Sequence, residues 1–424
     1  QKRNNSFHTI RILSGQIKPR AELRYGNFSP FEKGDNPAAL ISQRTRLNLF
    51  YEYKDIFSVK ISPQMVNIWG QDGNTQGLGI TNGFSLFEGW ARINSSKSTH
   101  FKIGRQIISL DDERFYGALD WAQGGRTHDA LSFHWKHKIV ELSTFLAYNQ
   151  NYKQLYGNNI NNPVGNLYSP IGATPYKWMQ TLWAKFNITD KDAISLLATN
   201  LGFQTMLTAN DTARNYNNQT YGINYFHTGK KWNINASGYY QMGQNAGGRK
   251  ISAYLAAVGV SYKIANKWKI GIGSELVSGN KVGVAPATIS NAFTSYFVTG
   301  HKFYGHMDYY YAGNGHKEAG LSDNFLTLGF IPSQKWDLFL NMHQFIAPYG
   351  VNNGIENLSN NLGQEFDLGF NIKINKFIKI NGGYSLYITT PTVAFLKNKT
   401  NTRMDQHWGW LTLDITPVFL NLKH

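Results

Sequence analysis

The sequence predicts a transmembrane antiparallel β-barrel, an all-β fold, from three observations. Charged residues make up only 16% of the 424-residue chain, whereas aromatic residues reach 14% and there are 41 glycines, a composition typical of strands and turns. No apolar run reaches 18 residues, which excludes a transmembrane helix. The hydrophobic pattern has a period of two, with one apolar face and one charged face. A barrel with lipid outside and water inside satisfies both faces.

The alternation is clear in the first predicted strand. Between residues 17 and 25, apolar side chains alternate with Lys18, Arg20, Glu22 and Arg24. A soluble β-sandwich would have to bury each apolar face against a second sheet. The predicted strands are too many, and their polar faces too charged, for that arrangement. The pattern therefore favours the barrel over the sandwich.

We expect 18 strands in a single barrel domain that spans residues 1–424. Short turns that carry a lysine alternate with long outer loops, some of them folded into the lumen. This alternation is typical of single-chain outer-membrane barrels, which place both termini in the periplasm. The predicted strands span 9–25, 44–53, 57–70, 84–94, 99–108, 127–137, 139–150, 177–187, 193–207, 218–228, 231–242, 251–264, 267–278, 323–331, 336–345, 363–373, 377–388 and 406–418.

One segment tests the strand count. Residues 301–311 have the local pattern of a further strand, which would make the count 19. It would also exchange long and short connections for the rest of the chain and put the long loops 346–362 and 389–405 in the periplasm. We therefore interpret 279–322 as one long outer loop that folds inward.

The inner wall is predicted to be basic. The net charge is +16, which indicates an acidic partner. Strands 1 to 6 are adjacent and place Arg and Lys on their inner face, where such side chains select anions. The alternative is a ladder of salt bridges with Glu22, Glu52, Glu88 and Glu141 that only holds the wall together. The candidate pore-lining and solute-binding residues are Arg20, Arg24, Arg44, Arg46, Lys60, Arg92, Lys102, Arg105, Arg114, Arg126 and His134.

The densest charge cluster lies between Gly104 and Asp129, around the loop 109–126. Such a polar loop can lie inside a wet barrel, so we expect it to narrow the lumen and to pair with the basic wall. Phe101 and Ile103 face lipid, and the two-residue alternation of the strand would place Arg105 on the same face. We expect a bulge at Gly104 to turn Arg105 toward the lumen instead. The predicted constriction network consists of Asp111, Asp112, Glu113, Asp129 and Asp308.

At these residues the sequence resembles the alginate export porin family. The stretch KIGRQIISLDDERFYGALDWAQGGRTHDALSFHW (102–135) is similar to the signature of that family, and HKFYGHMDYY (301–310) and IKPRAELRYGN (17–27) resemble two further motifs. The resemblance implies an 18-stranded outer-membrane barrel with a basic lumen that passes an anionic polysaccharide or its fragments. The signature positions are Arg105, Asp112, Glu113, Arg114, Arg126 and Asp129.

Other chemistries are less well supported by the sequence. No Gly-x-Ser-x-Gly elbow is present, and Asp112 and Glu113 are adjacent, so on a strand they would point apart; we expect no enzyme. His301, His306 and His316 match no metal-ligand spacing, and 71–74 reads as a turn more readily than as a calcium loop. Cysteine is absent. We expect no metal, no cofactor and no nucleic acid partner.

The sequence thus predicts a porin in the outer membrane of a Gram-negative bacterium. It would pass anionic solutes, with acidic saccharides as the expected class, by passive diffusion, and would contact membrane lipid and lipopolysaccharide. The alternative is a barrel subunit or scaffold of a larger outer-membrane transport or secretion complex. An outward strip of small residues would indicate such a partner, and the nearest candidate is 253–260 with Gly271 and Gly273.

Overall fold

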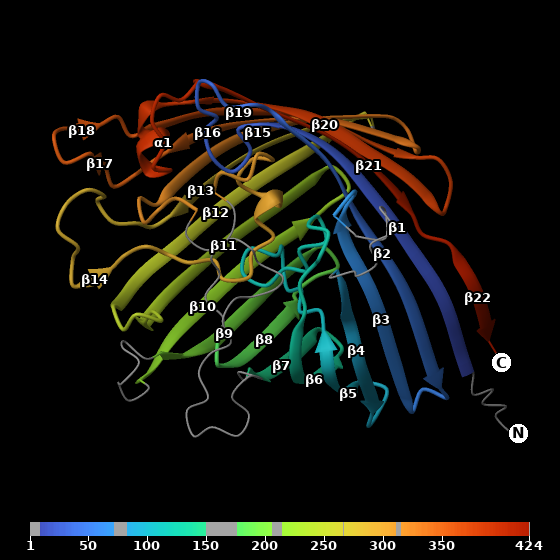
Figure 1. The fold of residues 1–424 in the computed structure, drawn as a ribbon. Coiled ribbons are helices and arrows are strands. Elements are labelled where there is room, and N and C mark those ends of the chain that lie inside the picture. Colours follow the sequence, from blue (N-terminus) through green and yellow to red (C-terminus); the bar gives the residue numbers. More distant parts are fainter. Residues whose placement is uncertain are drawn as a thin grey trace, which may run out of the picture.

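The computed structural model describes residues 9–71, 83–149, 176–205, 214–265, 267–310 and 315–423. Antiparallel strands close into one barrel (Figure 1). The strands are β1 (Thr9–Tyr25), β2 (Ala38–Tyr53), β3 (Phe57–Ile68), β4 (Phe84–Asn94), β5 (Thr99–Gln106), β6 (His128–His137), β7 (Val140–Tyr148), β8 (Trp178–Asn187), β9 (Asp192–Thr205), β10 (Arg214–Thr228), β11 (Trp232–Gln244), β12 (Lys250–Ile264), β13 (Trp268–Val277), β15 (Leu321–Ser333), β16 (Trp336–Ile346), β19 (Asn361–Lys373), β20 (Ile378–Thr389), β21 (Asp405–Ile415) and β22 (Val418–Lys423).

The predicted count of 18 strands is confirmed. The sheet contains 20 strand segments, but β14 (Ile289–Ser290) is a two-residue piece of a loop, and β21 and β22 are two halves of one interrupted strand. Both halves pair with β1 and close the barrel: Arg20 is opposite Thr412, and Leu13 is opposite Leu420. The short hairpin β17 (Val351–Asn352) and β18 (Asn357–Leu358) lies outside the barrel sheet.

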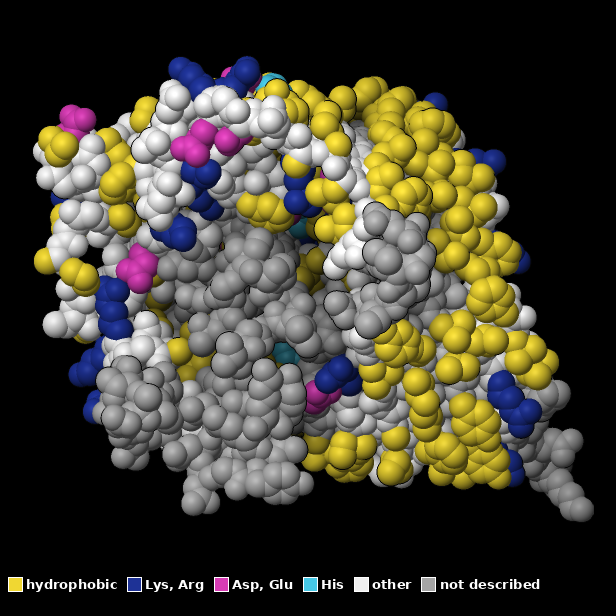
Figure 2. Space-filling model, in the orientation of Figure 1, with side chains coloured by type: hydrophobic (Ala, Val, Ile, Leu, Met, Phe, Trp, Pro, Cys, Tyr) yellow, Lys and Arg dark blue, Asp and Glu magenta, His cyan; other side chains and the backbone are white. Residues whose placement is uncertain are grey.

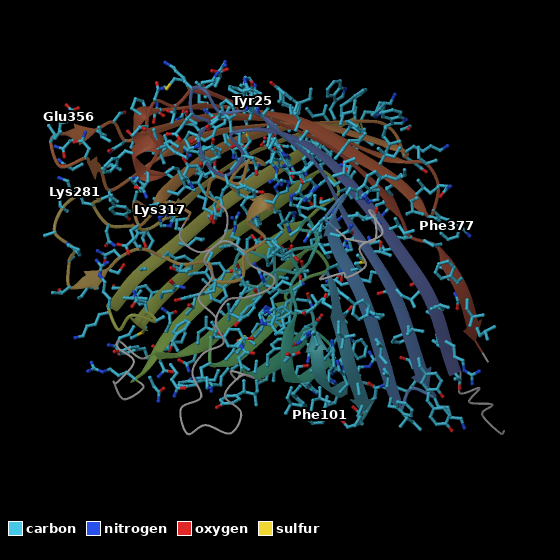
Figure 3. All side chains as sticks on the ribbon, viewed as in Figure 1. Tyr25, Phe101, Lys281, Lys317, Glu356 and Phe377 are labelled. Atoms are coloured by element: carbon cyan, nitrogen blue, oxygen red, sulfur yellow. The ribbon has the colours of Figure 1, made fainter. Side chains whose placement is uncertain are left out.

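The two ends of the barrel differ as predicted. The short turns join β2 to β3, β4 to β5, β6 to β7 and so on around one end, where both described chain ends also lie (Figure 1). The first turn, residues 54–56, has positive φ at Lys54 (50°) and Asp55 (54°), and the Ile56 N–H donates to the Tyr53 carbonyl, as in a type I′ turn, whose twist suits a hairpin. The long loops gather at the other end, marked by Lys281 and Glu356 in Figure 3.

The outer face of the wall is apolar. Leu23 and Ile272 are 55% and 65% exposed, while their neighbours on the strand turn to the lumen. Hydrophobic side chains cover the face over β20, β21, β1 and β2 in Figure 2. Aromatic pairs sit at the short-turn end, including Trp268 stacked on Phe330 with ring centroids 4.2 Å apart. No helix in the described part of the chain is long and apolar enough to span a membrane.

The core of the molecule lies inside the barrel. Three connections at the long-loop end contribute buried side chains to it: 107–127, 278–320 and 390–404. The second contains a short 3₁₀ helix, η3 (Gly300–Lys302), and the third contains α1 (Pro391–Leu396). The described part of the segment 301–311, which runs to residue 310, forms no strand, as the strand count predicted, and Met307 and Tyr309 within it are buried.

Candidate functional site in the lumen

The loop 107–127 runs from the end of β5 to the start of β6 and meets the wall formed by β1 and β2. Arg44 donates from Nη2 to Asp120 Oδ1 over 2.9 Å and from Nη1 to the Gln123 carbonyl over 3.4 Å. The Gln123 amide donates back to the carbonyl oxygens of Lys18 and Ser42. An acid of this loop therefore pairs with the basic wall, as predicted. The acid is Asp120, and not one of the three loop acids named in the predicted constriction network.

Arg20 holds the same part of the loop. Its guanidinium donates to Glu22 Oε1 over 2.9 Å and to the Trp121 carbonyl over 3.0 Å, and it lies 4.4 Å from the centroid of the Trp121 ring. Glu22 also accepts hydrogen bonds from Arg24 and from Trp408 Nε1. Because a charge-assisted hydrogen bond is stronger than a neutral one, these contacts fix Trp121 against the wall.

The start of the loop is tied to a different part of the wall. The Asp111 carboxylate accepts hydrogen bonds from Trp183, Ser195 and Asn224, on β8, β9 and β10. Burial raises the pKa of the Asp111 carboxyl, although the hydrogen bonds from Ser195 and Trp183 oppose the rise. Nearby, the Tyr116 hydroxyl contacts the hydroxyls of Thr181 and Thr199 at 2.7 and 2.8 Å.

Arg114 reaches a third place on the wall. Its guanidinium pairs with Glu275 on β13 and, over 2.9 Å, with Asp112, and it lies 4.2 Å from the centroid of the Phe303 ring. Together with the Arg44 and Asp111 contacts, this pair makes the loop a crosspiece that is bonded to β2, to β8–β10 and to β13. The sequence predicted that the loop narrows the lumen, and this geometry is consistent with that role.

The second inward loop, 278–320, packs against the crosspiece. Arg126 donates to the carbonyl oxygens of Phe297 and Val298 and so joins the two loops. The His301 ring stacks on Trp121 with centroids 3.9 Å apart, and its Nδ1 is 3.1 Å from Asp308. Burial, with a smaller contribution from Arg20, lowers the pKa of His301 to about 3.

The loop 278–320 is in turn bonded to β19 and β20. The backbone N–H groups of His306 and Met307 donate to Asp367 and Glu365, and the hydroxyl of Tyr310 is 2.7 Å from that of Tyr387. Asp308, predicted to join the constriction network, is buried within this layer.

Four predicted solute-binding residues are corrected by these contacts. Their side chains are buried under the loops and are not presented to a solute in this structure: Arg20, Arg44, Arg114 and Arg126. Three predicted acids of the network also pair differently, since Asp111 meets β8–β10, Asp112 meets Arg114, and Glu113 accepts from Ser109. The two-residue alternation of a strand predicts which side chains point into the lumen, but it does not predict which of these side chains a loop will cover.

Arg105 and Asp129 require a further correction, because both lie on the outer face. The register of β5 with β6 is continuous, with Gly104 opposite Ala130 and Arg105 opposite Asp129. Gly104 has φ of +116°, but no extra residue is inserted there, so the expected bulge does not form and the parity of Ile103 continues to Arg105. The guanidinium instead meets the Asp129 carboxylate with two hydrogen bonds of 2.9 and 2.8 Å.

The remaining basic residues stay partly open to water. Between the crosspiece and the short-turn end, Lys60 pairs with Glu88, and Arg92 pairs with Glu52. The side chains of Lys60 and Arg92 are 28% and 29% exposed. Lys102 lies over the ring of Trp90, 4.9 Å from its centroid, and His134 contacts Ser132 and Ser143. Arg46 contacts Gln64 and the Phe87 ring. On the other side of the crosspiece, Arg24 is half-buried.

Several residues of the site were not singled out from the sequence. Asp120 and Gln123 lie within the predicted loop, but nothing local distinguishes them from its other polar residues. Glu275, Glu365 and Asp367 alternate with apolar residues, so their parity predicts an inward direction but not their loop partners. Of the turn 71–74 that could hold calcium, residues 72–74 lie outside the described part of the chain.

The strip of small residues considered for a partner does not form an outward surface. Ala253 and Ala257 of β12 are buried on the lumen side, and Gly271 and Gly273 share the inward parity of Glu275. Apart from Ala256, the outward positions between them carry larger side chains, among them Tyr254, Val258 and Ile272.

The fold and the inward loops define a class of protein, the closed 18-stranded barrel whose own loops partly fill the lumen. Solved structures similar to this chain include Acinetobacter baumannii OccAB2 (TM-score 0.64, 10% identity, 97% of this chain and 98% of that chain covered) and Pseudomonas aeruginosa OpdL (0.62, 11%, 97% and 99%). A third is the outer membrane protein OpdK from Pseudomonas aeruginosa (0.59, 9%, 96% and 99%). At such identities the likeness establishes the fold alone.

The sequence itself matches no protein-family model and no curated protein. The similar structures are those of Occ and Opd proteins, so the resemblance to the alginate export porin family is not supported.

Proposed function

We propose that this chain is a passive diffusion channel for small anionic solutes in the outer membrane of a Gram-negative bacterium. The observation that carries the proposal is a closed barrel with an apolar outer wall and a charged inner wall, crossed by an inward loop. An apolar outer face suits lipid, and a charged inner face needs water. The fold likeness to OpdK, an outer membrane protein, supports the location.

The preference for anions is argued from the part of the inner wall that water reaches. In the described part of the chain, Lys60, Arg92 and Lys102 face the lumen, and the acids that pair with them are Glu88 and Glu52. Among the described residues, Lys102 forms no ion pair, since its ammonium lies over the Trp90 ring. A wall with an excess of cations raises the local concentration of anions and lowers the barrier to their passage.

We propose small acidic saccharides as the solute class. A carboxylate can pair with Arg92 or Lys102, which lie opposite each other on β4 and β5. The crosspiece is bonded to three parts of the wall, which favours single sugars and short fragments over a threaded polysaccharide. We also propose that the short turns and both termini face the periplasm and that residues 1–424 form one domain.

Reversal potentials in planar bilayers under a salt gradient test the proposal. The wild-type channel is expected to prefer anions, and the variant Lys60→Gln/Arg92→Gln/Lys102→Gln is expected to lose that preference. The matched control removes three lysines from the short turns instead, Lys97→Gln/Lys138→Gln/Lys191→Gln, and should retain it. Cation preference of the wild type would overturn the proposal.

A further inference from the structure

A row of uncharged polar side chains crosses the outer face of β13, β15, β16 and β19 near the long-loop end. Ser274 donates to Asn324 over 2.8 Å, and Asn324 donates to Ser322 over 3.3 Å. Gln364 donates to Gln344 over 2.9 Å, and Gln344 donates to Asn361 over 2.8 Å. Ser274, Asn324, Gln344 and Gln364 lie an even number of positions from Ile272 or Leu368 on their own or paired strands, so they face outward like these exposed residues. Asn361 is exposed next to Gln344 after a register shift in β19.

Directly beside this row lies a groove of about 620 Å³ in the outer wall. Its floor is apolar and includes Val258, which is 47% exposed, and Ile272. Ser274, Asn324, Gln344 and Gln364 form its polar side. The groove thus combines an apolar trough with a hydrogen-bonding edge, which are the two features that an amphiphile needs.

The chemistry of the edge indicates which head group fits. An amide side chain offers two N–H groups and a carbonyl with two lone pairs, and each bond within the row uses only one of them. The remaining donors and acceptors of Asn324 and Gln364 are exposed. Of the described residues that line the groove, His343 alone can carry a charge, and its ring turns inward to Asp323. An uncharged edge suits hydroxyl and amide groups better than a phosphate.

We propose that this groove binds an acylated saccharide of the outer leaflet, with an acyl chain in the trough and the sugar on the amide row. The proposal rests on the proposed membrane orientation, which puts the long-loop end of the wall in the outer leaflet. The sugar ring of such a lipid carries hydroxyl and amide groups next to its acyl chains. The polar groups of the sugar would therefore lie against the amide row while the acyl chain lies in the adjacent apolar trough.

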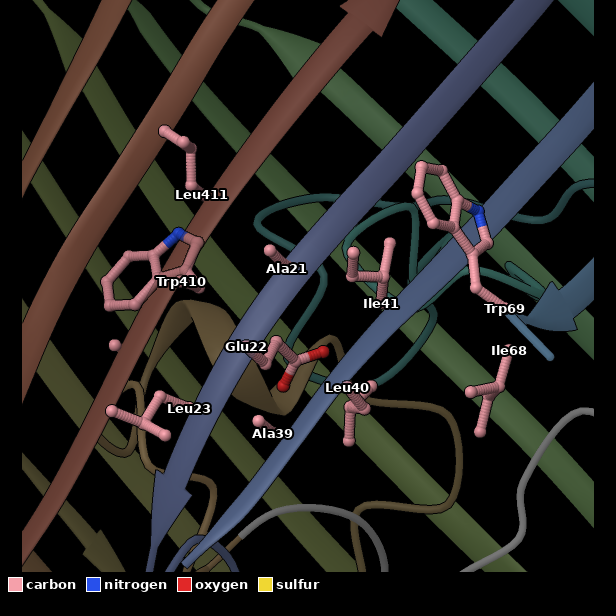
Figure 4. A pocket seen from close by; sticks show the side chains of 11 residues that line it. Ala21, Glu22, Leu23, Ala39, Leu40, Ile41, Ile68, Trp69, Trp410 and Leu411 are labelled. Carbon is pink, nitrogen blue, oxygen red and sulfur yellow. The ribbon is translucent and has the colours of Figure 1, made fainter.

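A second outer groove provides a contrast within the same chain. It lies over β21, β1 and β2, has a volume of about 680 Å³, and is lined by Leu23, Ile41, Trp69 and Leu411 (Figure 4). Glu22 borders it, but its carboxylate is bonded to Arg20 and Arg24 on the lumen side. None of the described residues that line this groove has an amide side chain. We therefore expect it to accept acyl chains without preference for a head group.

Lipid retention measured by native mass spectrometry tests the proposal. The full-length protein is reconstituted in phosphatidylethanolamine vesicles that contain either monophosphoryl lipid A or phosphatidylglycerol, and is then released into detergent. The wild type should retain lipid A and lose phosphatidylglycerol. Asn324→Leu/Gln344→Leu/Gln364→Leu should reduce lipid A retention by about tenfold or more, since each lost hydrogen bond weakens binding at least about twofold.

The matched control makes the same change in an outward amide row on β8–β10 that does not line the groove, Gln180→Leu/Asn200→Leu/Gln219→Leu. Equal loss in both triple variants would overturn the proposal, because the retention would then come from a general lipid surface. Retention of phosphatidylglycerol as strong as that of lipid A would overturn it too. So would a second copy of the chain that covers the groove, seen as a dimer mass.

The absence of cysteine allows an independent test. Ile272→Cys, labelled with a bulky maleimide, should block lipid A retention, whereas Ala39→Cys in the second groove should not when labelled in the same way. Retention unaffected by the label at residue 272 would contradict the proposal. Neither test measures conductance, so failure of the lipid site and failure of the channel function are distinguishable.

Discussion

The guanidinium of Arg44 lies 2.9 Å from Asp120 Oδ1, although the two residues are 76 positions apart in the chain. The Arg44 side chain is fully buried, whereas the Asp120 side chain is 66% exposed. The strand supplies the cation and the loop supplies the acid, so the pair fixes the crosspiece to the β2 wall. Lys18 lies 3.8 Å from the other oxygen of the same carboxylate.

Asp120→Asn is expected to loosen the crosspiece. It leaves the buried Arg44 without its counter-ion, and removal of one partner of a buried ion pair costs about 3–5 kcal/mol, less where one partner is exposed to solvent as Asp120 is. Single-channel recordings should show a higher and noisier conductance. The heat-dependent shift of the band on a gel should show that the barrel still folds. Glu356→Gln, at an exposed acid of the long-loop end, serves as the control and should leave the conductance unchanged.

Arg114→Ala is expected to raise the single-channel conductance and to weaken selectivity. The change leaves Glu275 buried on β13 without its guanidinium partner, at a cost of about 3–5 kcal/mol to the packing of the loop. The double variant Arg114→Ala/Glu275→Ala should recover part of the loss, because the buried Glu275 carboxylate is then absent and only Asp112 still lacks its guanidinium partner. Conductance and selectivity like those of the wild type in Arg114→Ala would show that the loop does not restrict the pore.

Arg105→Ala is expected to leave the conductance and ion selectivity unchanged, because Arg105 lies on the outer face with Asp129. Both side chains are partly exposed, and exposed ion pairs contribute about 0–1 kcal/mol, so the thermal midpoint of unfolding should fall only slightly. Paired recordings of Arg105→Ala and Arg114→Ala compare the two arginines of the charge cluster directly. A large change in ion selectivity for Arg105→Ala would contradict the outward placement of Arg105 and would indicate that it faces the lumen.

Acid is expected to release the inward loop 278–320. The buried His316 ring accepts a hydrogen bond at Nδ1 from the Gly320 N–H over 3.0 Å, and burial, with Lys397, lowers its pKa to about 4. Because this pKa lies below the ordinary value of 6.5, the stabilisation is complete above about pH 6.5 and is lost as the pH falls toward 4. Conductance should therefore rise, and the loop should become more sensitive to protease, between pH 7.5 and pH 4.5.

His316→Asn tests the assignment, since an amide oxygen can accept the same hydrogen bond without taking a proton. This variant should show a smaller change between the two pH values. Some change should persist, because burial also lowers the pKa of His301 to about 3 and that of His306 to about 4. A pH response identical to that of the wild type would exclude His316 as a contributor.

The sequence by itself determined the barrel, its strand count and the direction of most wall side chains. Lipid on one side of the wall and water on the other impose a two-residue period that can be recognised within a single strand. At Leu23 and Arg24, for example, an apolar side chain that faces lipid is followed by a charged one that faces the lumen. The same rule placed Arg105 outward, and the bulge expected to reverse it was wrong because the register of β5 and β6 is continuous.

Only the tertiary structure decided which inward charges a loop covers. Arg114 meets Glu275 across 161 positions, and Arg126 meets the carbonyl of Phe297 across 171. Such contacts depend on where each loop crosses the lumen, and no local pattern encodes that path. The alternation of a strand is set by its immediate surroundings, whereas the pairing of a buried charge is set by whichever distant group the closed barrel brings within hydrogen-bonding distance.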